Sequence, residues 1–132
     1  MRVSCGTDVV DVGRIEKSIK TNARFAKKVF TDNEIEYCEN KKAGRYESYA
    51  ARFAAKEAFL KAMGTGLFEG ASLTDIEVVN ETGPVWGSGA PSFKLSGAAA
   101  DIYRQRGGAS LSLSISHTAG TALAMVVALF ED

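Results

Sequence analysis

Lys56, Glu57 and Lys61 are the residues best placed to do chemistry, because they lie in a segment made otherwise of alanines and large apolar residues. At about 100° per residue, Lys56 falls within the bulky arc of a helix, and Glu57 lies at its edge beside Lys61. Charges between two apolar faces must be paired, bound to a metal or exposed in a cleft. A carboxylate flanked by lysines is a combination that can bind a cation and a phosphate. Glu57 and Lys61 could instead form a simple ion pair between residues four positions apart on one helix.

Asp8 is a second carboxylate of interest, because it follows the small, flexible pair Gly6-Thr7 in a segment with strand character. With Glu57 it would give Mg²⁺ two carboxylate ligands from separate elements, leaving other positions for water and substrate phosphate oxygens. Acidic residues are common near strand ends, so spacing alone does not establish this metal site.

Several basic residues lie in or next to the same helix, and a tripeptide with two glycines follows its end. The basic residues are Arg45, Arg52, Lys56 and Lys61, and the tripeptide is Gly64-Thr65-Gly66. Arginine can grip a phosphate with two donors, and glycines let backbone amides approach it. The alternative is a solvated helix face with an ordinary glycine cap. The one histidine, His117, follows an alternating segment, and a lone histidine is more often structural than catalytic.

The patterning predicts an α+β fold in which an antiparallel sheet packs against a long central helix. Apolar alternation and helical periodicity distinguish the two kinds of element, and Thr31 with Glu34 forms a capping box. We expect strands over 3–10, 74–79, 91–95, 111–116 and 122–130, the last two as a hairpin. We expect helices over 12–20, 32–40, 48–63 and 98–106, a loop over 41–47 and a turn over 81–84.

The composition indicates one compact domain spanning residues 1–132. Lys and Arg balance Asp and Glu at 16 each, so no overall field would hold nucleic acid. The first residues lack the apolar core of a signal peptide, and no apolar run could span a membrane, which predicts a cytoplasmic location. Cys5 and Cys38 are too isolated for a disulfide framework and are interpreted as reduced and structural.

Three segments together resemble the signature segments of the holo-(acyl carrier protein) synthase family. They are residues 6–15, 53–61 and 114–117, and their order and spacing match over nearly the whole chain. The resemblance implies the 4'-phosphopantetheinyl transferase fold and Mg²⁺-dependent transfer of 4'-phosphopantetheine from coenzyme A to a serine of apo acyl carrier protein. Adenosine 3',5'-bisphosphate would leave, and the reaction would serve fatty acid biosynthesis or secondary metabolism. One departure is Asp11, where the family usually has Glu.

The resemblance also implies roles for individual residues. Asp8 and Glu57 match the metal-binding carboxylates, and Lys61 would assist the developing charge. The residues expected around the nucleotide are Arg45, Arg52, Lys56, Gly64, Thr65, Gly66, Pro84 and His117. Lys56 could instead pair with a carboxylate inside the core. The base that takes the serine proton is left open among Glu57, Asp8 and a metal-bound water.

Two kinds of partner are expected. An acidic carrier protein would dock on a basic region near the amino terminus, at Arg14, Lys17, Arg24, Phe25 and Lys28. A solvated face is the alternative for these charges. Longer members of the superfamily look like two fused units, so this chain would supply its second half as a homotrimer with sites at subunit interfaces.

Two other functions would use the same features. A magnesium-dependent phosphohydrolase would need the carboxylates but no carrier protein. A non-enzymatic module for acidic proteins would need only the basic region, and this alternative leaves Lys56, Glu57 and Lys61 without a purpose.

Overall fold

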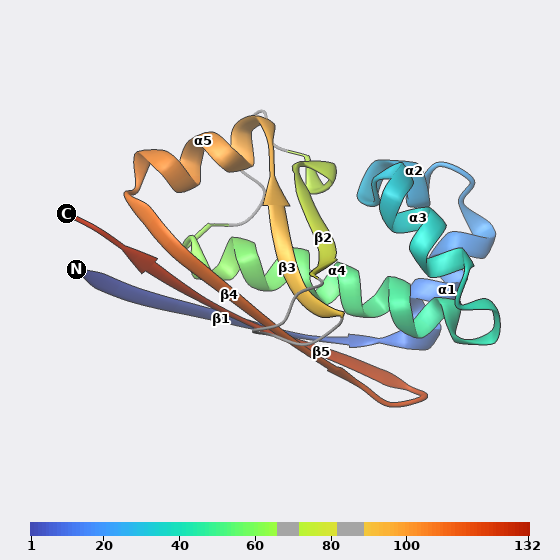
Figure 1. Cartoon of the computed structure of the whole chain (residues 1–132). Coiled ribbons are helices and arrows are strands. Elements are labelled where there is room, and N and C mark those ends of the chain that lie inside the picture. The colour runs from blue at the N-terminus through green and yellow to red at the C-terminus, as the bar shows by residue number, and fades with distance from the viewer. Residues whose placement is uncertain (66–71, 82–88) are drawn as a thin grey trace.

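A three-stranded antiparallel sheet crossed by one long helix forms the centre of the molecule (Figure 1). The structure is a computed structural model that describes residues 1–65, 72–81 and 89–132. The strands are β1 (Arg2–Asp11), β4 (Gly108–His117) and β5 (Thr121–Phe130), in the order β1-β5-β4. The expected hairpin of β4 and β5 is confirmed, with His117 paired to Ala122 at its end. The long antiparallel strands and the covering helix confirm the α+β prediction.

Helix α4 (Arg45–Ala62) lies on the sheet face formed by alternate residues of β5. The residues of β5 on that face are all buried: Ala122, Ala124, Val126, Ala128 and Phe130. Most are alanines, and α4 presents Ala54, Ala55 and Ala58, which are also fully buried. Small side chains on both surfaces let the helix lie close to the sheet.

Gly6 on β1 makes the closest approach between strand and helix. A Cβ atom at this position would lie 2.2 Å from the Ala58 carbonyl oxygen and 2.6 Å from the Ala62 amide nitrogen. Ser4, two residues earlier, donates from its hydroxyl to the Ala62 carbonyl at 2.6 Å and so satisfies one carbonyl at the end of the helix. The sequence from Ser4 to Asp8 is therefore fitted to the last turns of α4.

Three short helices gather at the amino-terminal end of α4 (Figure 1). They are α1 (Val12–Thr21), α2 (Phe25–Val29) and α3 (Asp32–Glu39), followed by the 3₁₀ turn η1 (Lys42–Gly44). Asp11 caps α1, since its carboxylate accepts from the Gly13 amide at 2.9 Å. The capping box of Thr31 and Glu34 is confirmed. The predicted loop over 41–47 is wrong, because η1 leads directly into α4, which begins three residues before the expected start.

A second, two-stranded sheet and one helix complete the fold. The turn η2 (Leu73–Asp75) leads into β2 (Ile76–Glu81), which pairs with β3 (Ala90–Leu95), and α5 (Gly97–Gln105) follows. These confirm the expected strands and helix to within a few residues. Ser96 is the N-cap residue of α5, but its side chain makes no capping hydrogen bond. Residues 82–84 of the predicted turn lie outside the described residues.

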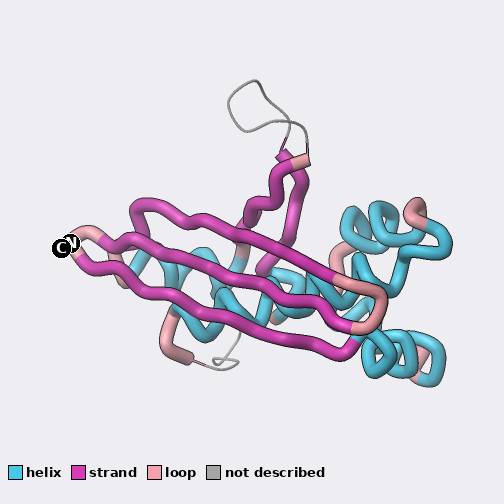
Figure 2. The backbone as a smooth tube through the Cα atoms, turned by 90° about the horizontal axis from the view of Figure 1, so that it is seen from below, coloured by secondary structure: helices cyan, strands magenta, loops and turns pink. Residues whose placement is uncertain are grey.

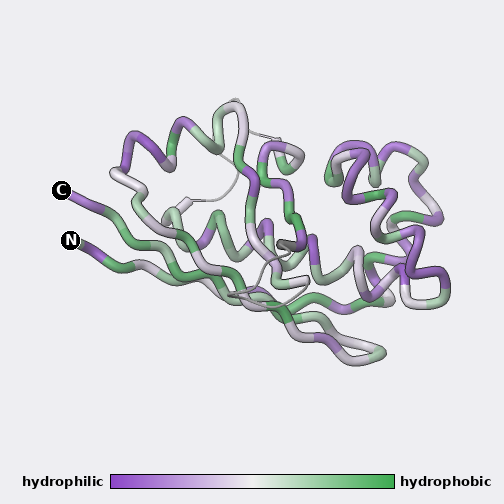
Figure 3. The backbone as a smooth tube through the Cα atoms, in the orientation of Figure 1, coloured by the Kyte–Doolittle hydropathy of each residue, from purple (hydrophilic) through white to green (hydrophobic). Residues whose placement is uncertain are grey.

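The face of the main sheet away from α4 is open. In Figure 2 the three long strands lie in front of α4, and no described helix covers their near side. Val3 and Val9 of β1 are 64% and 66% exposed there, beside the exposed Leu123, Met125 and Val127 of the central strand. Figure 3 shows hydrophobic residues along both β1 and β5. An apolar surface of this extent on a sheet face is unusual unless it binds a partner.

Gly6→Ala tests the close approach of β1 and α4. The added methyl group collides with helix backbone, which cannot rotate away, so we expect a loss of about 1 to 3 kcal/mol in the free energy of unfolding. Urea denaturation measures it. Gly120→Ala is the matched control, because nothing lies within 4 Å of a Cβ there. Equal stability of the two variants would contradict this account of the packing.

Candidate active site

Asp8 and Lys61 meet where β1 passes under the last turns of α4. Asp8 lies on the helix-facing side of β1, between the buried Gly6 and Val10. The Lys61 ammonium group donates to Asp8 Oδ1 at 3.1 Å and to the Thr7 carbonyl at 2.9 Å. Asp8 is 17% exposed and Lys61 is 56% exposed, so the pair opens to solvent through the lysine.

Glu57 lies one turn before Lys61 and completes the acidic pair. Burial raises the pKa of its carboxyl, and the nearby Asp8 raises it further, while Lys61 and Arg14 oppose the shift. The folded chain thus holds a proton on Glu57 more tightly than the unfolded chain, and the ionised carboxylate opposes folding at neutral pH. No sequence pattern indicates the influence of Arg14, because helices α2 and α3 lie between it and Glu57 in the chain.

The two carboxylates fit a hard divalent cation. Like charges held close together in a half-buried site favour either a shared proton or a cation between them. Among the described residues no group of three or more acidic, histidine or cysteine side chains is arranged to hold a metal. Asp8 and Glu57 could therefore supply only part of a coordination shell, and oxygen ligands from water or a bound phosphate would have to complete it.

Lys56 is fully buried, and its ammonium group has a complete set of acceptors. It donates to Glu34 Oε1 at 2.8 Å, to the Leu73 carbonyl at 2.9 Å and to the Ile76 carbonyl at 2.8 Å. Glu34 is also fully buried and accepts from the amides of Thr31 and Val78. Burial lowers the pKa of Lys56, and the Glu34 carboxylate opposes that change. Of the two roles open for Lys56, the geometry favours the structural one, since no donor is left for a ligand.

Arg45 and Arg52 point away from the acidic pair. Arg45 begins α4, where it pairs with Glu39 at 3.4 Å and donates to the Lys42 carbonyl at 2.9 Å. Arg52 is only 5% exposed. Its guanidinium lies 3.9 Å from the centre of the Tyr37 ring and donates to Asn80 at 2.7 Å. The Nε atom of Arg52 is buried without a hydrogen-bond partner among the described residues.

The other predicted nucleotide-binding residues are spread over the fold. Gly64 ends α4 with a positive φ of 78°, which favours glycine, and the Thr65 amide returns to the Leu60 carbonyl. Gly66 and Pro84 lie outside the described residues. His117 is exposed on β4, whereas Asp8 is on β1, so the whole width of the sheet separates them. At about 4.8 Å between strands this is about 10 Å, too far for one small group to bridge.

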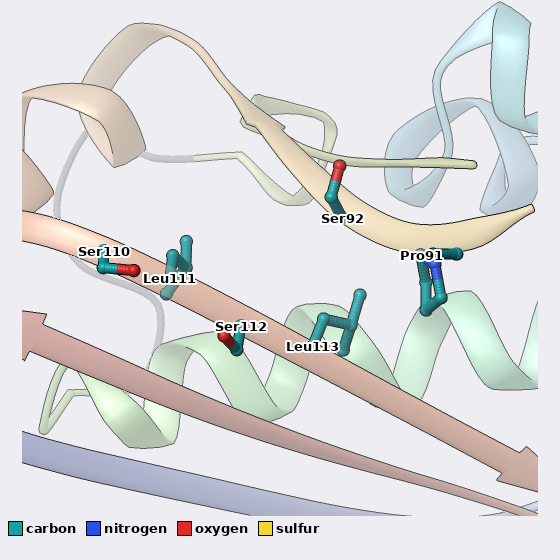
Figure 4. A pocket seen from close by; sticks show the side chains of 7 residues that line it. Pro91, Ser92, Ser110, Leu111, Ser112 and Leu113 are labelled. Atoms are coloured by element: carbon teal, nitrogen blue, oxygen red, sulfur yellow. The ribbon is translucent and has the colours of Figure 1, made fainter. Parts of the chain in front are cut away.

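A cavity of about 460 Å³ lies between β3 and β4, away from the acidic pair. Figure 4 shows Pro91 and Ser92 from β3 on one side, with side chains of β4 on the other. Its lining residues are Ala90, Pro91, Ser92, Ser110, Leu111, Ser112 and Leu113. Its described lining has no titratable side chain and so offers no acid or base for catalysis.

Comparison with known proteins assigns the chain to a family. The family model of the 4'-phosphopantetheinyl transferase superfamily matches residues 4–112. The holo-(acyl carrier protein) synthase of Ruminiclostridium cellulolyticum is 46% identical over 133 aligned positions, covering 100% of this chain and 96% of that protein. The chain belongs to the holo-(acyl carrier protein) synthase family. It is thus a phosphopantetheinyl transferase.

Solved holo-(acyl carrier protein) synthases share the fold. The crystal structure from Neisseria meningitidis has a TM-score of 0.81 at 33% identity, covering 96% of this chain and 97% of that one. The ACPS–CoA complex of Chronobacterium ammoniagenes has a TM-score of 0.84 at 26% identity, with full coverage of both chains. The predicted family and fold are confirmed.

The basic region expected to meet the carrier protein divides into paired and unpaired charges. Lys20 pairs with Glu16 and Lys27 pairs with Asp32, both at 2.7 Å. The basic residues predicted for docking are exposed and form no ion pair within the described part of the chain: Arg14, Lys17, Arg24 and Lys28. Phe25, predicted as an apolar anchor, instead stacks on Phe53 and is half-buried.

Lys56→Met separates the two roles that the sequence left open. Removing the ammonium group strands the buried Glu34 carboxylate, so we expect a loss of about 3 to 5 kcal/mol in the free energy of unfolding. Lys61→Met, on the same helix, removes an exposed pair and should cost at most about 1 kcal/mol. Urea denaturation compares them. A stable Lys56→Met variant with weakened coenzyme A binding would instead place Lys56 in the substrate site.

Proposed function

We propose that this chain transfers 4'-phosphopantetheine from coenzyme A to a serine of apo acyl carrier protein, releasing adenosine 3',5'-bisphosphate, and that Mg²⁺ is required. The cluster of Asp8, Glu57 and Lys61 is the observation that carries the proposal. It combines two convergent carboxylates with an exposed ammonium group, which suits phosphoryl chemistry. The coenzyme A complex of the related Chronobacterium ammoniagenes protein supports the substrate.

Each residue of the cluster has a distinct task. Asp8 and Glu57 would hold the cation, which when bound neutralises charge on the pyrophosphate of coenzyme A. Lys61, with its ammonium group on the open side of the pair, would donate to the phosphate oxygens as the bond to the leaving bisphosphate breaks.

The open face of the sheet supports a homotrimer. A cyclic trimer uses a heterologous interface, in which two different surfaces of neighbouring protomers meet, whereas a twofold dimer pairs one surface with itself. Asp8 and His117 lie on opposite edge strands of one sheet. A heterologous contact would bring the β1 edge of one protomer to the β4 edge of the next, so that His117 meets a nucleotide bound at the neighbour's Asp8. Three sheets joined edge to edge around a threefold axis could then turn their open faces, with the exposed Leu123, Met125 and Val127 of β5, toward one another.

The remaining nucleotide-binding proposals follow from the family resemblance. Gly64, Thr65, Gly66 and Pro84 would contact the nucleotide, and Arg45 is exposed enough to reach its phosphates. Arg52 would have to give up its contacts with Asn80 and Tyr37 to do so.

The unpaired charges of α1 and α2 support docking of an acidic carrier protein. Arg14 has a second significance, because it is close enough to Glu57 to lower its pKa. A carrier bound along α1 would therefore bring its serine toward the acidic pair. We place the reaction in the cytoplasm and in fatty acid biosynthesis. No described helix has the length and hydropathy of a membrane span.

The direct test incubates the protein with coenzyme A, Mg²⁺ and an apo acyl carrier protein and weighs the carrier by mass spectrometry. We expect the carrier to gain one phosphopantetheine group. Glu57→Gln should slow the gain on the order of a hundredfold or more, because the site loses a cation ligand. Release of nucleotide without carrier would favour a phosphohydrolase, and no mass gain with folded protein would remove the proposal.

Mixing two inactive variants tests the shared site. Glu57→Gln and His117→Ala would each damage a different half of every interface. After unfolding and refolding together, a random trimer has intact Glu57 facing intact His117 at about one interface in four, so about a quarter of wild-type activity should return. Each variant refolded alone is the control. No recovery, with mixed trimers shown by native mass spectrometry, would place both residues in one protomer's site.

Charge reversal tests the docking region without disturbing the acidic pair. Arg24→Glu with Lys28→Glu should raise KM for the carrier several-fold at low salt, and the difference from wild type should shrink at high salt. Lys94→Glu on β3 is the control, since it changes charge on another exposed surface. An unchanged KM would make this region an ordinary solvated face.

A further inference from the structure

Lys61 and Lys56 lie on the same helix but differ in their freedom to move. The ammonium group of Lys56 is enclosed and held by three acceptors. That of Lys61 is more than half exposed and is held by Asp8 and one strand carbonyl. An exposed pair of this kind is weak and exchanges readily with solvent, so Lys61 can leave Asp8 without disturbing the fold.

The position of Lys61 conflicts with a cation on the same carboxylate. Its nitrogen lies 3.1 Å from Asp8 Oδ1 and so occupies one of the two oxygens that Asp8 could offer to a divalent ion. Both groups are positive, and they would compete for the lone pairs and the charge of one carboxylate. Lys61 also favours the ionised form of Glu57 by lowering its pKa. Without a cation, its ammonium group therefore offsets part of the negative charge that a cation would otherwise offset.

We propose that Lys61 competes with the divalent cation for Asp8 and, once displaced, turns its ammonium group to the phosphates of coenzyme A. This inference rests on the proposed function and adds a coupling to it. The cation binds more tightly when phosphates are present to receive Lys61, and coenzyme A binds more tightly when the cation has freed the lysine. Thermodynamic linkage requires the two effects to be equal.

The competition predicts opposite effects of one substitution in two conditions. Without coenzyme A, Lys61→Gln removes the competitor, so its Kd for Mg²⁺ alone should fall about two- to fivefold below that of wild type. With saturating coenzyme A, wild-type protein should gain Mg²⁺ affinity, and the variant should gain distinctly less. A lysine whose ammonium group stays away from Asp8, in solvent, would leave the affinity for Mg²⁺ alone nearly unchanged, because water and salt screen its charge.

Isothermal titration of Mg²⁺ into each protein, with and without coenzyme A, measures both effects. Lys61→Arg keeps the charge and should resemble wild type in the absence of coenzyme A. Lys94→Gln makes the same change of net charge on exposed β3 and should also resemble wild type. Urea midpoints show that each variant is folded.

The outcomes separate this inference from the proposed function. If wild-type protein binds Mg²⁺ and modifies the carrier, but Lys61→Gln binds Mg²⁺ alone no more tightly, the competition is refuted and the proposed function stands. If wild-type protein neither binds Mg²⁺ nor modifies the carrier, both are refuted. Tighter binding by Lys61→Gln alone among the variants supports the competition.

Discussion

The close approach of α4 to β1 is the constraint on which the site depends. A glycine at position 6 and alanines on the facing side of the helix remove the side chains that would hold the two backbones apart. At that separation a carboxylate on the strand and groups on the last turns of the helix share one small volume. Asp8, Glu57 and Lys61 therefore meet because the side chains beside them are small, as well as because of their own chemistry.

The buried pair of Lys56 and Glu34 holds the opposite side of the same helix. The Glu34 carboxylate accepts from the Thr31 amide at the start of α3 and from the amide of Val78 on β2, and it pairs with Lys56 of α4, so one carboxylate joins three elements. A buried ion pair is stabilising only when its remaining hydrogen-bonding positions are filled, and here they are. Adjacent residues of α4 thus have separate functions, since Lys56 anchors the helix in the core while Glu57 opens to the site.

The two faces and the two edge strands of the main sheet have different roles. The face toward α4 is packed with alanines and carries Asp8 at one edge, while the other face exposes larger apolar side chains. A small chain that leaves such a face uncovered has a structural reason to assemble, and assembly is also what would bring His117 to the distant acidic pair. Stability and completion of the site would then depend on the same contact.

Local patterns in the sequence were sufficient to predict most elements and to single out the residues of the candidate site. Alternation located β4, an apolar run located β5, and helical spacing located α4. The capping residues Thr31 and Glu34, three positions apart, marked the start of α3. The unusual placement of charges in segment 53–61 indicated Glu57 and Lys61, and the family resemblance joined them to Asp8. Such inferences succeed because each depends on neighbours in sequence or on one helix face.

Tertiary structure alone decided the partners that are distant in the chain. Periodicity showed that Lys56 points among apolar groups, but packing determined that Glu34 meets it there. The same holds for Arg14 near Glu57 and for Arg52 over Tyr37. The early start of α4 also escaped prediction, because η1 joins it without a marked boundary. A sequence shows which face of an element is apolar, whereas the residue opposite that face is set by how the whole chain packs.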